Sequence, residues 1–197
     1  SNKRGIVVNA YLQSSQPHIW AAGDIAGGYQ FTHVADFMAR TVAGNIVKPF
    51  PLLYSKFDTS VVPWSTYTSP EVARVGLNEK EAKRNNTAYD VYRVGFDDVD
   101  RAVTERTTEG FAKVLTEKGK DRILGATLVG EGAGDILHEL VLAMKHGIGL
   151  GKIAGTIHAY PTHAEVARKL GDAYNRTRLT PRTRSIFKWL FERARKK

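Results

Sequence analysis

The chain has 197 residues, of which 42% are hydrophobic and 25% are charged. This balance excludes wholesale disorder and a collagen-like fibre, and the length suffices for one or two domains with a proper core. The sequence has no cysteine, which excludes disulfides, thiolate metal sites and thiol catalysis within this chain. No apolar run approaches the ~18 residues that cross a bilayer, and no signal segment opens the chain, so we expect a cytoplasmic protein.

The net charge of +9 is concentrated at the C-terminus. Residues 176–197 hold nine basic residues and one acid, which leaves 20 basic and 19 acidic residues for the remainder of the chain. The body is therefore nearly neutral, and the total charge does not indicate nucleic-acid binding. Phe187, Trp189, Leu190 and Phe191 lie among the cations of the tail. This composition suits weak contact with an anionic membrane surface through residues 182–197, and a solvated helix is the alternative.

The first segment, residues 1–50, is predicted to contain a short strand and a helix. The apolar run Ile19-Trp20-Ala21-Ala22 reads as the strand, and Gly23-Asp24 stops it. Val34, Met38, Val42 and Ile46 then recur four residues apart, which predicts a helix. Lys48-Pro49-Phe50-Pro51 ends this helix and marks a domain boundary, because proline cannot continue a helix and restrains the residue before it.

The second segment, residues 51–166, is predicted to alternate strands with two helices. We expect strands over residues 54–62, 89–96, 110–117 and 122–131, the last two joined by a hairpin turn. Asn78 with Glu81 three residues later is typical of a helix start. A second helix carries an apolar stripe, which suits either a dimer interface or an inner packing face; the stripe is Ile136, Leu137, Leu140, Val141 and Met144. Hairpins with flanking helices predict an antiparallel sheet of the α+β class.

The third segment, residues 167–197, is predicted to be a basic helical tail. Thr162 and Glu165 have the form of a capping box, so we expect a helix from there to about Asn175. A final short helix should follow Thr180-Pro181.

Two sequence features suggest a chemical site but have a simpler structural explanation. Residues 130–134 and 147–151 are rich in glycine, but neither fits a dinucleotide-binding loop, and we interpret both as turns and caps. His158, His163 and Glu165 lie close in sequence, but Pro161 breaks the spacing that a helical metal site needs, so no metal is predicted.

Asp24 is the sharper candidate. It directly follows the predicted strand and a glycine, where a carboxylate can accept hydrogen bonds from a sugar-like hydroxyl. The helix from Thr32 points its N-terminal amides toward any nearby anion or carbonyl. An ordinary strand–turn–helix is an equal alternative.

A series of short motifs runs in a fixed order between residues 5 and 166. They are Gly5-Ile6-Val7-Val8-Asn9, Ile19-Trp20-Ala21-Ala22-Gly23-Asp24, Thr32-His33-Val34-Ala35, Ser69-Pro70-Glu71-Val72-Ala73-Arg74-Val75-Gly76, Arg101-Ala102, Gly110-Phe111-Ala112-Lys113, Arg122-Ile123-Leu124-Gly125-Ala126 and Ile157-His158-Ala159-Tyr160-Pro161-Thr162. In this order and spacing they resemble the end of the FAD domain and the dimerisation domain of the pyridine nucleotide-disulphide oxidoreductases. Lipoamide dehydrogenase, glutathione reductase and mercuric reductase belong to that family.

The resemblance implies both a fold and a cofactor. It implies that residues 1–50 are the remnant of a doubly wound FAD-binding domain, and that the α+β domain forms a homodimer. Gly23 and Asp24 would contact FAD, with Asp24 on the ribityl chain, and Thr32 and His33 would pass beside the flavin ring. NAD(P)H would be the electron donor, and no nucleic-acid partner is expected.

One position departs from the family pattern. Disulphide-reducing members carry a histidine immediately before the Pro-Thr pair, with a following glutamate as its orienter, and this chain has Tyr160 there while Glu165 remains. A phenol with an ordinary pKa of about 10 is a poor general base near neutrality. Mercuric reductases also place a tyrosine here, but they add a C-terminal cysteine pair that this chain lacks. Glu165 could instead complete the capping box.

These observations favour the C-terminal part of a longer FAD- and NAD(P)H-dependent oxidoreductase, nearest to the mercuric-reductase-like branch, with an undetermined acceptor. Tyr160 and Glu165 are its candidate catalytic residues. We expect the fragment alone to be inactive, because the upstream cofactor and cysteine motifs are missing. The rival hypothesis is a non-catalytic dimeric module that docks to an anionic membrane or to nucleic acid through its basic tail.

Overall fold

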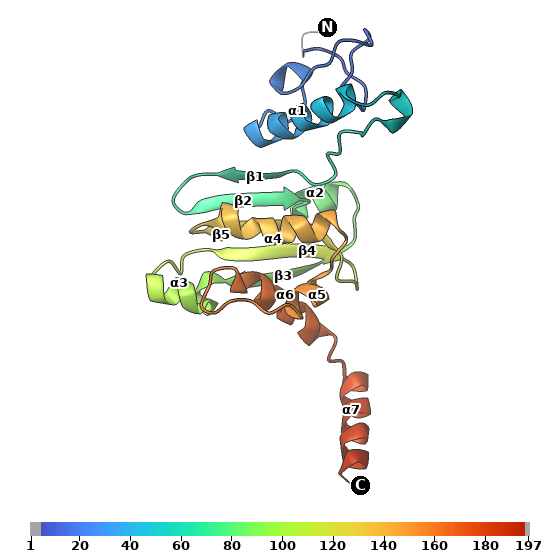
Figure 1. Ribbon diagram of the computed structural model, residues 1–197. Helices are drawn as coiled ribbons and strands as arrows, with labels where there is room; N and C mark the ends of the chain where they lie inside the picture. The colour runs from blue at the N-terminus through green and yellow to red at the C-terminus, as the bar shows by residue number, and fades with distance from the viewer. Residues whose placement is uncertain (1–4, 196–197) are drawn as a thin grey trace. The chain divides into compact units, whose positions relative to one another are not determined.

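The computed structural model describes residues 5–195 and divides into two compact units, Ser1–Val62 and Pro63–Lys197 (Figure 1). The outer ends of the expected first segment and of the expected tail, residues 1–4 and 196–197, lie outside the described residues. The boundary between the two compact units follows residue 62, whereas the sequence pattern predicts a domain boundary after residue 50. A contact boundary and a domain boundary need not coincide, and the division into residues 1–50, 51–166 and 167–197 stays a prediction.

The first unit is built on one helix, α1 (Thr32–Ile46), with the short 3-10 helices η1 (Asp24–Ala26) and η2 (Pro51–Leu53) on either side in sequence. The predicted helix is confirmed, and its buried Val34 and Met38 pack with Leu12 as a small apolar core. The strand expected at residues 19–22 is wrong. Trp20 forms only an isolated bridge with Gln13, because the chain turns away at once into η1.

The strand expected over residues 54–62 is also wrong, since the first strand begins at Pro63. The backbone here is tied to its own unit. The Ser55 amide donates to Asn45 Oδ1 at 2.7 Å, and the Phe57 amide donates to the Ala10 carbonyl at 2.8 Å. Backbone groups held by a buried asparagine and a loop are not available to a sheet.

The second unit contains one five-stranded antiparallel sheet in the order β1-β2-β5-β4-β3, which confirms the α+β prediction. Its strands are β1 (Pro63–Thr66), β2 (Glu71–Gly76), β3 (Tyr89–Gly95), β4 (Phe111–Glu117) and β5 (Ile123–Gly130). The predicted β4–β5 hairpin is confirmed. Val114 and Leu115 point to opposite faces of β4 and are both buried, so this strand is covered on both sides.

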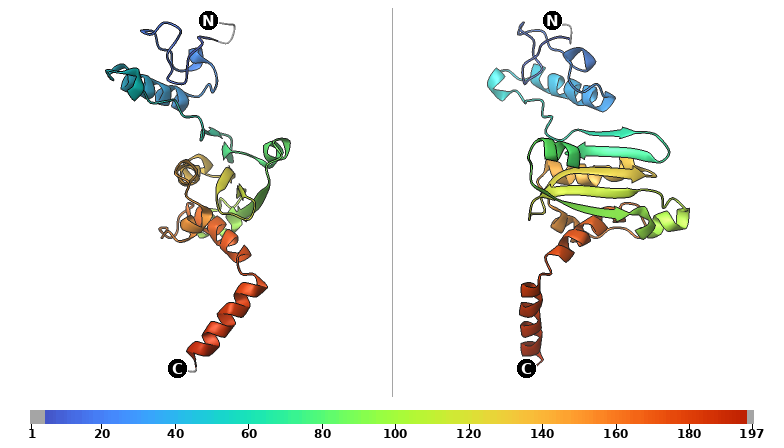
Figure 2. Two further views of the ribbon diagram at one scale, coloured as in Figure 1. Left: turned by 90° about the vertical axis from the view of Figure 1, so that its right-hand side faces the viewer. Right: turned by 180° about the vertical axis from the view of Figure 1, so that it is seen from behind.

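Helices cover the sheet. Their bounds are α2 (Glu79–Arg84), α3 (Asp100–Glu105), α4 (Ala133–Lys145), α5 (Leu150–Ala154), α6 (Glu165–Thr177) and α7 (Pro181–Ala194), with the 3-10 turn η3 (Phe96–Asp98) before α3. Figure 2 shows α4 and α2 on opposite sides of the sheet. Helix α4 packs on β5 and β2, and α6 packs on β3 and β4.

Two residues of the stripe expected on α4 form an inner packing face, since Leu137 and Leu140 are fully buried against the sheet. Ile136, Val141 and Met144 are only half-buried in the single chain, so a dimer interface at these three positions stays a prediction. Helix α6 is positioned by α5 through Gly171, where an added Cβ would lie 2.5 Å from the Leu150 carbonyl oxygen. Only a glycine permits this close contact, which lets α6 pack tightly against α5.

The two predicted caps have different outcomes. The Asn78–Glu81 capping box is confirmed, with the Glu81 amide donating to Asn78 Oδ1 at 2.8 Å and the Asn78 amide donating to Glu81 Oε2 at 2.9 Å. The capping box at Thr162 is wrong, because α6 begins at Glu165 and the Thr162 hydroxyl donates to the Ala159 carbonyl. Among the described residues no helix is both long enough and apolar enough to cross a membrane.

The α2 capping box generates a stability prediction. The pKa of Glu81 lies below its ordinary value because the Asn78 amide donates to the carboxylate and Arg74 lies beside it. A lowered folded-state pKa means that the stabilisation is present above the unfolded-state pKa and is lost as the pH falls through the folded-state value. Glu81→Gln keeps an acceptor for the Asn78 amide but removes the charge beside Arg74 and the helix start, so we expect it to lower the free energy of unfolding by about 0.5 kcal/mol at neutral pH, and by less in acid.

Urea unfolding followed by circular dichroism at both pH values checks this. Lys80→Gln on the exposed side of the same helix is the control and should leave both transitions unchanged. An equal loss of stability at neutral and acid pH would contradict the assigned role of the carboxylate.

Candidate functional site

The loop over residues 156–164, between α5 and α6, carries Tyr160 and is held by a histidine. The His158 side chain is only 7% exposed. Its Nδ1 lies 2.9 Å from the Thr156 carbonyl oxygen, and its Nε2 lies 3.0 Å from Glu139 Oε1 on α4. Because each ring nitrogen faces an acceptor from a different segment, His158 fixes the path of the loop over α4.

Tyr160 stands at the exposed tip of this loop, with 70% of its surface accessible. Its hydroxyl donates to Asp100 Oδ2 at 2.7 Å, where Asp100 is the first residue of α3. This hydrogen bond and the negative charge of Asp100 raise the pKa of the Tyr160 phenol above its ordinary value. The side chain is therefore a neutral hydroxyl whose proton is directed to Asp100, so its oxygen can accept a hydrogen bond while the group is unsuited to abstracting a proton.

Glu165 lies close to Tyr160 but does not bind its hydroxyl. It is the first residue of α6 and is 8% exposed, and its Oε1 pairs with Arg168, which also pairs with Asp172 at 2.7 Å. Its other oxygen, Oε2, is buried and has no hydrogen-bond partner among the described residues. The charge of Glu165 adds a smaller contribution to the raised pKa of Tyr160. The structure thus brings the two predicted residues together, with Asp100 as the direct partner of the phenol.

The other histidines considered for a metal site are engaged separately. His163 Nε2 lies 3.5 Å from Glu105 Oε2 and 3.4 Å from the Thr107 hydroxyl, and its ring packs edge-on against Phe96. His158 has its carboxylate partner on α4, whereas His163 has its partner on α3. Within residues 5–195 no group of three or more His, Asp or Glu side chains is arranged to hold a metal ion.

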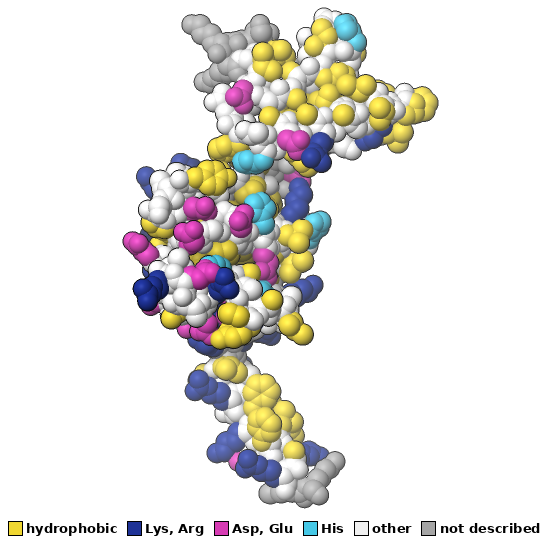
Figure 3. All heavy atoms as spheres, turned by 60° about the vertical axis from the view of Figure 1, so that its left-hand side comes forward, with side chains coloured by type: hydrophobic (Ala, Val, Ile, Leu, Met, Phe, Trp, Pro, Cys, Tyr) yellow, Lys and Arg dark blue, Asp and Glu magenta, His cyan; other side chains and the backbone are white. Residues whose placement is uncertain are grey.

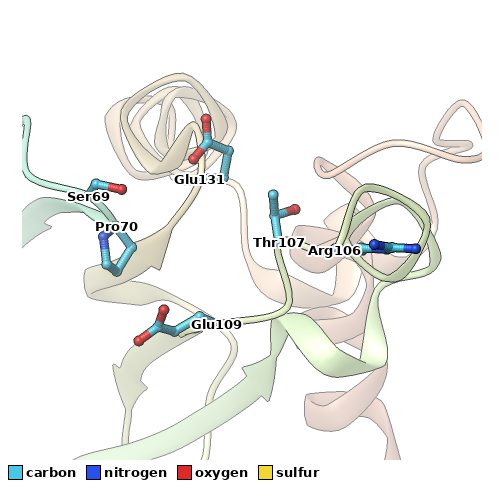
Figure 4. Close-up of a pocket in the computed structure, with 6 residues that line it drawn as sticks. All are labelled: Ser69, Pro70, Arg106, Thr107, Glu109 and Glu131. Carbon is cyan, nitrogen blue, oxygen red and sulfur yellow. The ribbon is translucent and has the colours of Figure 1, made fainter.

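A shallow polar depression of about 190 Å³ lies beside this region, at one end of the sheet (Figure 4). Three loops form it, and the lining residues are Ser69, Pro70, Arg106, Thr107, Glu109 and Glu131. Thr107 also contacts His163, so one wall of the depression adjoins the Tyr160 loop. The depression is open to solvent and mostly polar, and we assign no ligand to it.

The predicted cofactor residues all belong to the first unit. Gly23 is buried with φ +77°, and a Cβ there would lie 3.3 Å from the Ala35 side chain on α1. The Gly23 amide also lies 3.3 Å from Met38 Sδ. This turn therefore rests on α1 and leaves Asp24 exposed at the start of η1. Thr32 and His33 are the first two residues of α1, and the His33 ring stacks on Phe31 with centroids 5.3 Å apart.

Helix α1 begins without a conventional cap. Its N-cap residue is Phe31, which has no side-chain oxygen or nitrogen to bond the first amides. The first amides of α1 thus have no side-chain acceptor at the N-cap position. The positive end of the helix dipole and the exposed Asp24 carboxylate both belong to the first unit. Such an arrangement can hold a ligand that offers hydroxyl groups to the carboxylate and a carbonyl or anionic oxygen to the helix end.

Sequence reasoning missed two residues that shape the site, Asp100 and Glu139. Asp100 opens a one-and-a-half-turn helix that was not predicted, and Glu139 lies among other polar residues on α4. Both act on a loop more than a dozen residues away, so no local pattern marks them. Only the fold brings α3 and α4 to the Tyr160 loop.

Two family models match this chain. The model described as the dimerisation domain of pyridine nucleotide-disulphide oxidoreductases matches residues 62–170, and the model described as pyridine nucleotide-disulphide oxidoreductase matches residues 1–39. The first match covers the entire sheet and α4, and the second includes the Gly23–Asp24 turn and the start of α1.

Relatives and solved structures agree with this match. The chain is 35% identical over 165 residues to dihydrolipoyl dehydrogenase from Buchnera aphidicola, covering 82% of this chain and 33% of the relative. It is 36% identical over 168 residues to the mitochondrial dihydrolipoyl dehydrogenase of Sus scrofa, covering 83% of this chain and 31% of the relative. The chain thus spans about a third of the length of these relatives.

The fold is also similar to that of the HOCl-induced flavoprotein disulfide reductase RclA from Escherichia coli, in its Cu(II) complex. The TM-score is 0.78 with 27% identity, over 87% of this chain and 38% of that chain.

The Tyr160–Asp100 pair generates a titration prediction. Asp100→Asn removes the charge that favours the neutral phenol, so we expect the pKa of Tyr160 to fall toward its ordinary value. Carbon-13 NMR of ring-labelled tyrosine, with the resonance assigned by Tyr160→Phe, measures the change. Asp98→Asn is the control, since Asp98 pairs with Lys169 at 3.4 Å and not with Tyr160. The same Tyr160 pKa in the wild type and in Asp100→Asn would refute the pairing.

Proposed function

Because this chain belongs to the pyridine nucleotide-disulphide oxidoreductase family, we propose that it supplies the subunit interface and part of the cofactor site of a FAD-dependent enzyme. That enzyme takes electrons from NAD(P)H and delivers them to an acceptor. The observation that carries the proposal is the match of the sheet domain to the family's dimerisation domain, together with an exposed loop that presents a fixed phenol. We expect this chain alone to be inactive.

The first unit fits part of a flavin site. We propose that the Asp24 carboxylate accepts hydrogen bonds from the ribityl hydroxyls, and that Thr32 and His33 lie beside the isoalloxazine ring at the positive end of α1. Gly23 makes this geometry accessible, because its positive φ and its contact with Ala35 exclude a larger residue. FAD, when bound, would supply the hydride chemistry. The chain's own residues bind and orient it.

The first unit also has the surface expected of a part of a larger cofactor domain. It buries few apolar side chains and exposes many, and Figure 3 shows apolar groups gathered over it. The exposed large ones are Val7, Ile19, Ile25, Tyr29, Phe37, Ile46, Val47, Phe50, Leu52 and Leu53. Contiguous apolar surface of this kind is usually covered by another domain or by a ligand. We therefore propose that these residues pack against the remainder of a FAD domain.

Tyr160 is proposed as a catalytic residue that acts across the subunit interface. Because its proton is donated to Asp100, the neutral phenol can accept a hydrogen bond from the acceptor or contact it in the partner's redox site. Glu165 is proposed to contribute negative charge and to anchor the start of α6 through Arg168. A proton-abstracting role is disfavoured by the raised pKa of Tyr160.

For the electron acceptor we propose only a chemical class, a disulfide or a thiophilic metal ion. The curated relatives reported above are dihydrolipoyl dehydrogenases, and the structural relative is a flavoprotein disulfide reductase solved with Cu(II). A nearer relation to mercuric reductases stays a hypothesis that rests on Tyr160 alone. Lipoamide, Cu(II) and Hg(II) are accordingly the acceptors to assay.

The catalytic role of Tyr160 is tested in the flavoprotein that contains this chain. We expect Tyr160→Phe to lower turnover of the acceptor roughly tenfold to a hundredfold, since a positioned hydroxyl is lost, while flavin reduction by NAD(P)H proceeds at the wild-type rate. Stopped-flow absorbance of the flavin separates the two half-reactions. Wild-type turnover of lipoamide, Cu(II) and Hg(II) by Tyr160→Phe would show that the residue only packs at the interface.

The homodimer is tested with an exposed residue of the same loop. Ile157 is 97% exposed in the single chain and neighbours His158, so we propose that it is covered by the partner subunit. A two-fold interface contains each position twice, so Ile157→Asp would bury two carboxylates, and we expect the dimer dissociation constant to rise at least tenfold, as an order of magnitude.

Sedimentation velocity over a concentration series measures this effect. Tyr67→Asp, at a residue of the turn between β1 and β2 that is 84% exposed, is the matched control and should leave the dimer intact. A wild-type chain that stays monomeric at tens of micromolar, or an Ile157→Asp chain that dimerises normally, would rule out this interface.

A further inference from the structure

We propose that α7 is a docking helix that binds an anionic lipid surface. The inference rests on the charge and exposure of α7 and is independent of the proposed redox function. None of the residues of α7 is buried. The helix is capped at its start by Thr180, whose hydroxyl accepts from the Thr183 amide at 3.2 Å, and Pro181 follows at the first helical position. The sequence around Thr180 and Pro181 therefore determines where α7 begins, although no side chain of α7 is buried in a core.

The apolar side chains of α7 form one continuous face. Ile186 and Leu190 are four residues apart, as are Phe187 and Phe191, so the four side chains share one side of the helix. The Phe187 and Phe191 rings pack with centroids 6.4 Å apart. All four side chains are exposed. A row of exposed aromatic and aliphatic groups on one helix face is the shape that inserts shallowly between lipid headgroups.

Cations border this face on both sides. Arg184, Lys188 and Arg195 follow one edge, and Arg182 and Arg193 follow the other, where the Arg193 guanidinium lies 5.5 Å from the centre of the Trp189 ring. Glu192 is the one acid of the helix, and it pairs with Lys188 at 4.0 Å. Figure 3 shows the apolar side chains of α7 together, with Lys and Arg at their margins.

The charge distribution of α7 favours one kind of binding partner. A second α7 would bring like charges into contact on both edges of the apolar face, which disfavours pairing between copies. A nucleic acid would neutralise the cations but would leave the phenylalanine and leucine side chains in water. An anionic lipid surface satisfies both features at once, because phosphate groups meet the flanking cations and the hydrocarbon boundary meets the apolar face.

The test is co-sedimentation of the full chain with vesicles of phosphatidylcholine alone, or with about one third phosphatidylglycerol. We expect binding to the anionic vesicles only, weakened by salt. Arg184→Gln with Lys188→Gln should lower partitioning roughly twentyfold, since each cation at such a surface contributes about fivefold. Phe187→Gln with Leu190→Gln should lower it at least tenfold, as an order of magnitude. Leu142→Gln, a similarly exposed leucine on α4, is the matched control and should bind as the wild type.

Each outcome decides the proposal. Equal binding to neutral vesicles, wild-type binding by both α7 variants, or no binding by the wild type overturns it. Duplex DNA binding that needs the two cations but not Phe187 and Leu190 overturns it in favour of a nucleic acid. A smaller particle for Phe187→Gln with Leu190→Gln in the absence of vesicles, without vesicle binding by the wild type, makes the face an interface between copies. Because α7 has no buried residue, its variants should retain the wild-type thermal unfolding of the sheet domain, which circular dichroism verifies.

Discussion

The part-buried pairing of His158 with Glu139 is the interaction on which the candidate site depends. The loop over residues 156–164 has no regular secondary structure, so its backbone is not held by a ladder of hydrogen bonds. The imidazole ties the loop to α4, and the Tyr160 hydroxyl ties its tip to α3. Helix α4 in turn is fixed by Leu137 and Leu140 on the sheet. The position of an exposed phenol thus follows from an apolar core through two side-chain contacts.

Local patterns predicted the elements that depend on local physics. The period of α1, the Asn78 cap and the β4–β5 hairpin each involve residues within a few positions, and each is confirmed. The failures occurred where distant residues compete for the backbone. Residues 54–62 have strand-like composition, but Asn45 and Ala10 take their amides. Thr162 is the exception, because its competitor is local: its hydroxyl donates backward to the carbonyl of Ala159 and leaves Glu165 to begin α6 without a capping box.

For the site, the sequence marked the positions but not their partners. Tyr160 and Glu165 were noticed because of their place beside Pro161, and the structure holds them near one another. Glu165 was expected to orient residue 160, yet its accessible charge is directed to Arg168 and the phenol finds Asp100 instead. The physical reason is distance along the chain: α6 packs on β3 and β4, whereas α3 packs on the 3-10 turn around Phe96. Tyr160 and the α3 carboxylate that accepts its hydrogen bond are sixty residues apart in sequence.

The distribution of charge separates the two contact surfaces that we propose for this chain. The nearly neutral body lets two copies approach at the Ile157–Tyr160 loop without net repulsion, which a self-complementary interface requires. The tail is strongly cationic, so the same symmetry would place like charges together if it took part in that interface. Subunit pairing and docking through α7 therefore make opposite electrostatic demands. These demands are compatible because nine basic residues lie in the last 22 positions, while the remainder of the chain has 20 basic and 19 acidic residues. A two-fold dimer would carry two such helices, and two simultaneous contacts on one surface bind far more tightly than either alone when the geometry allows both.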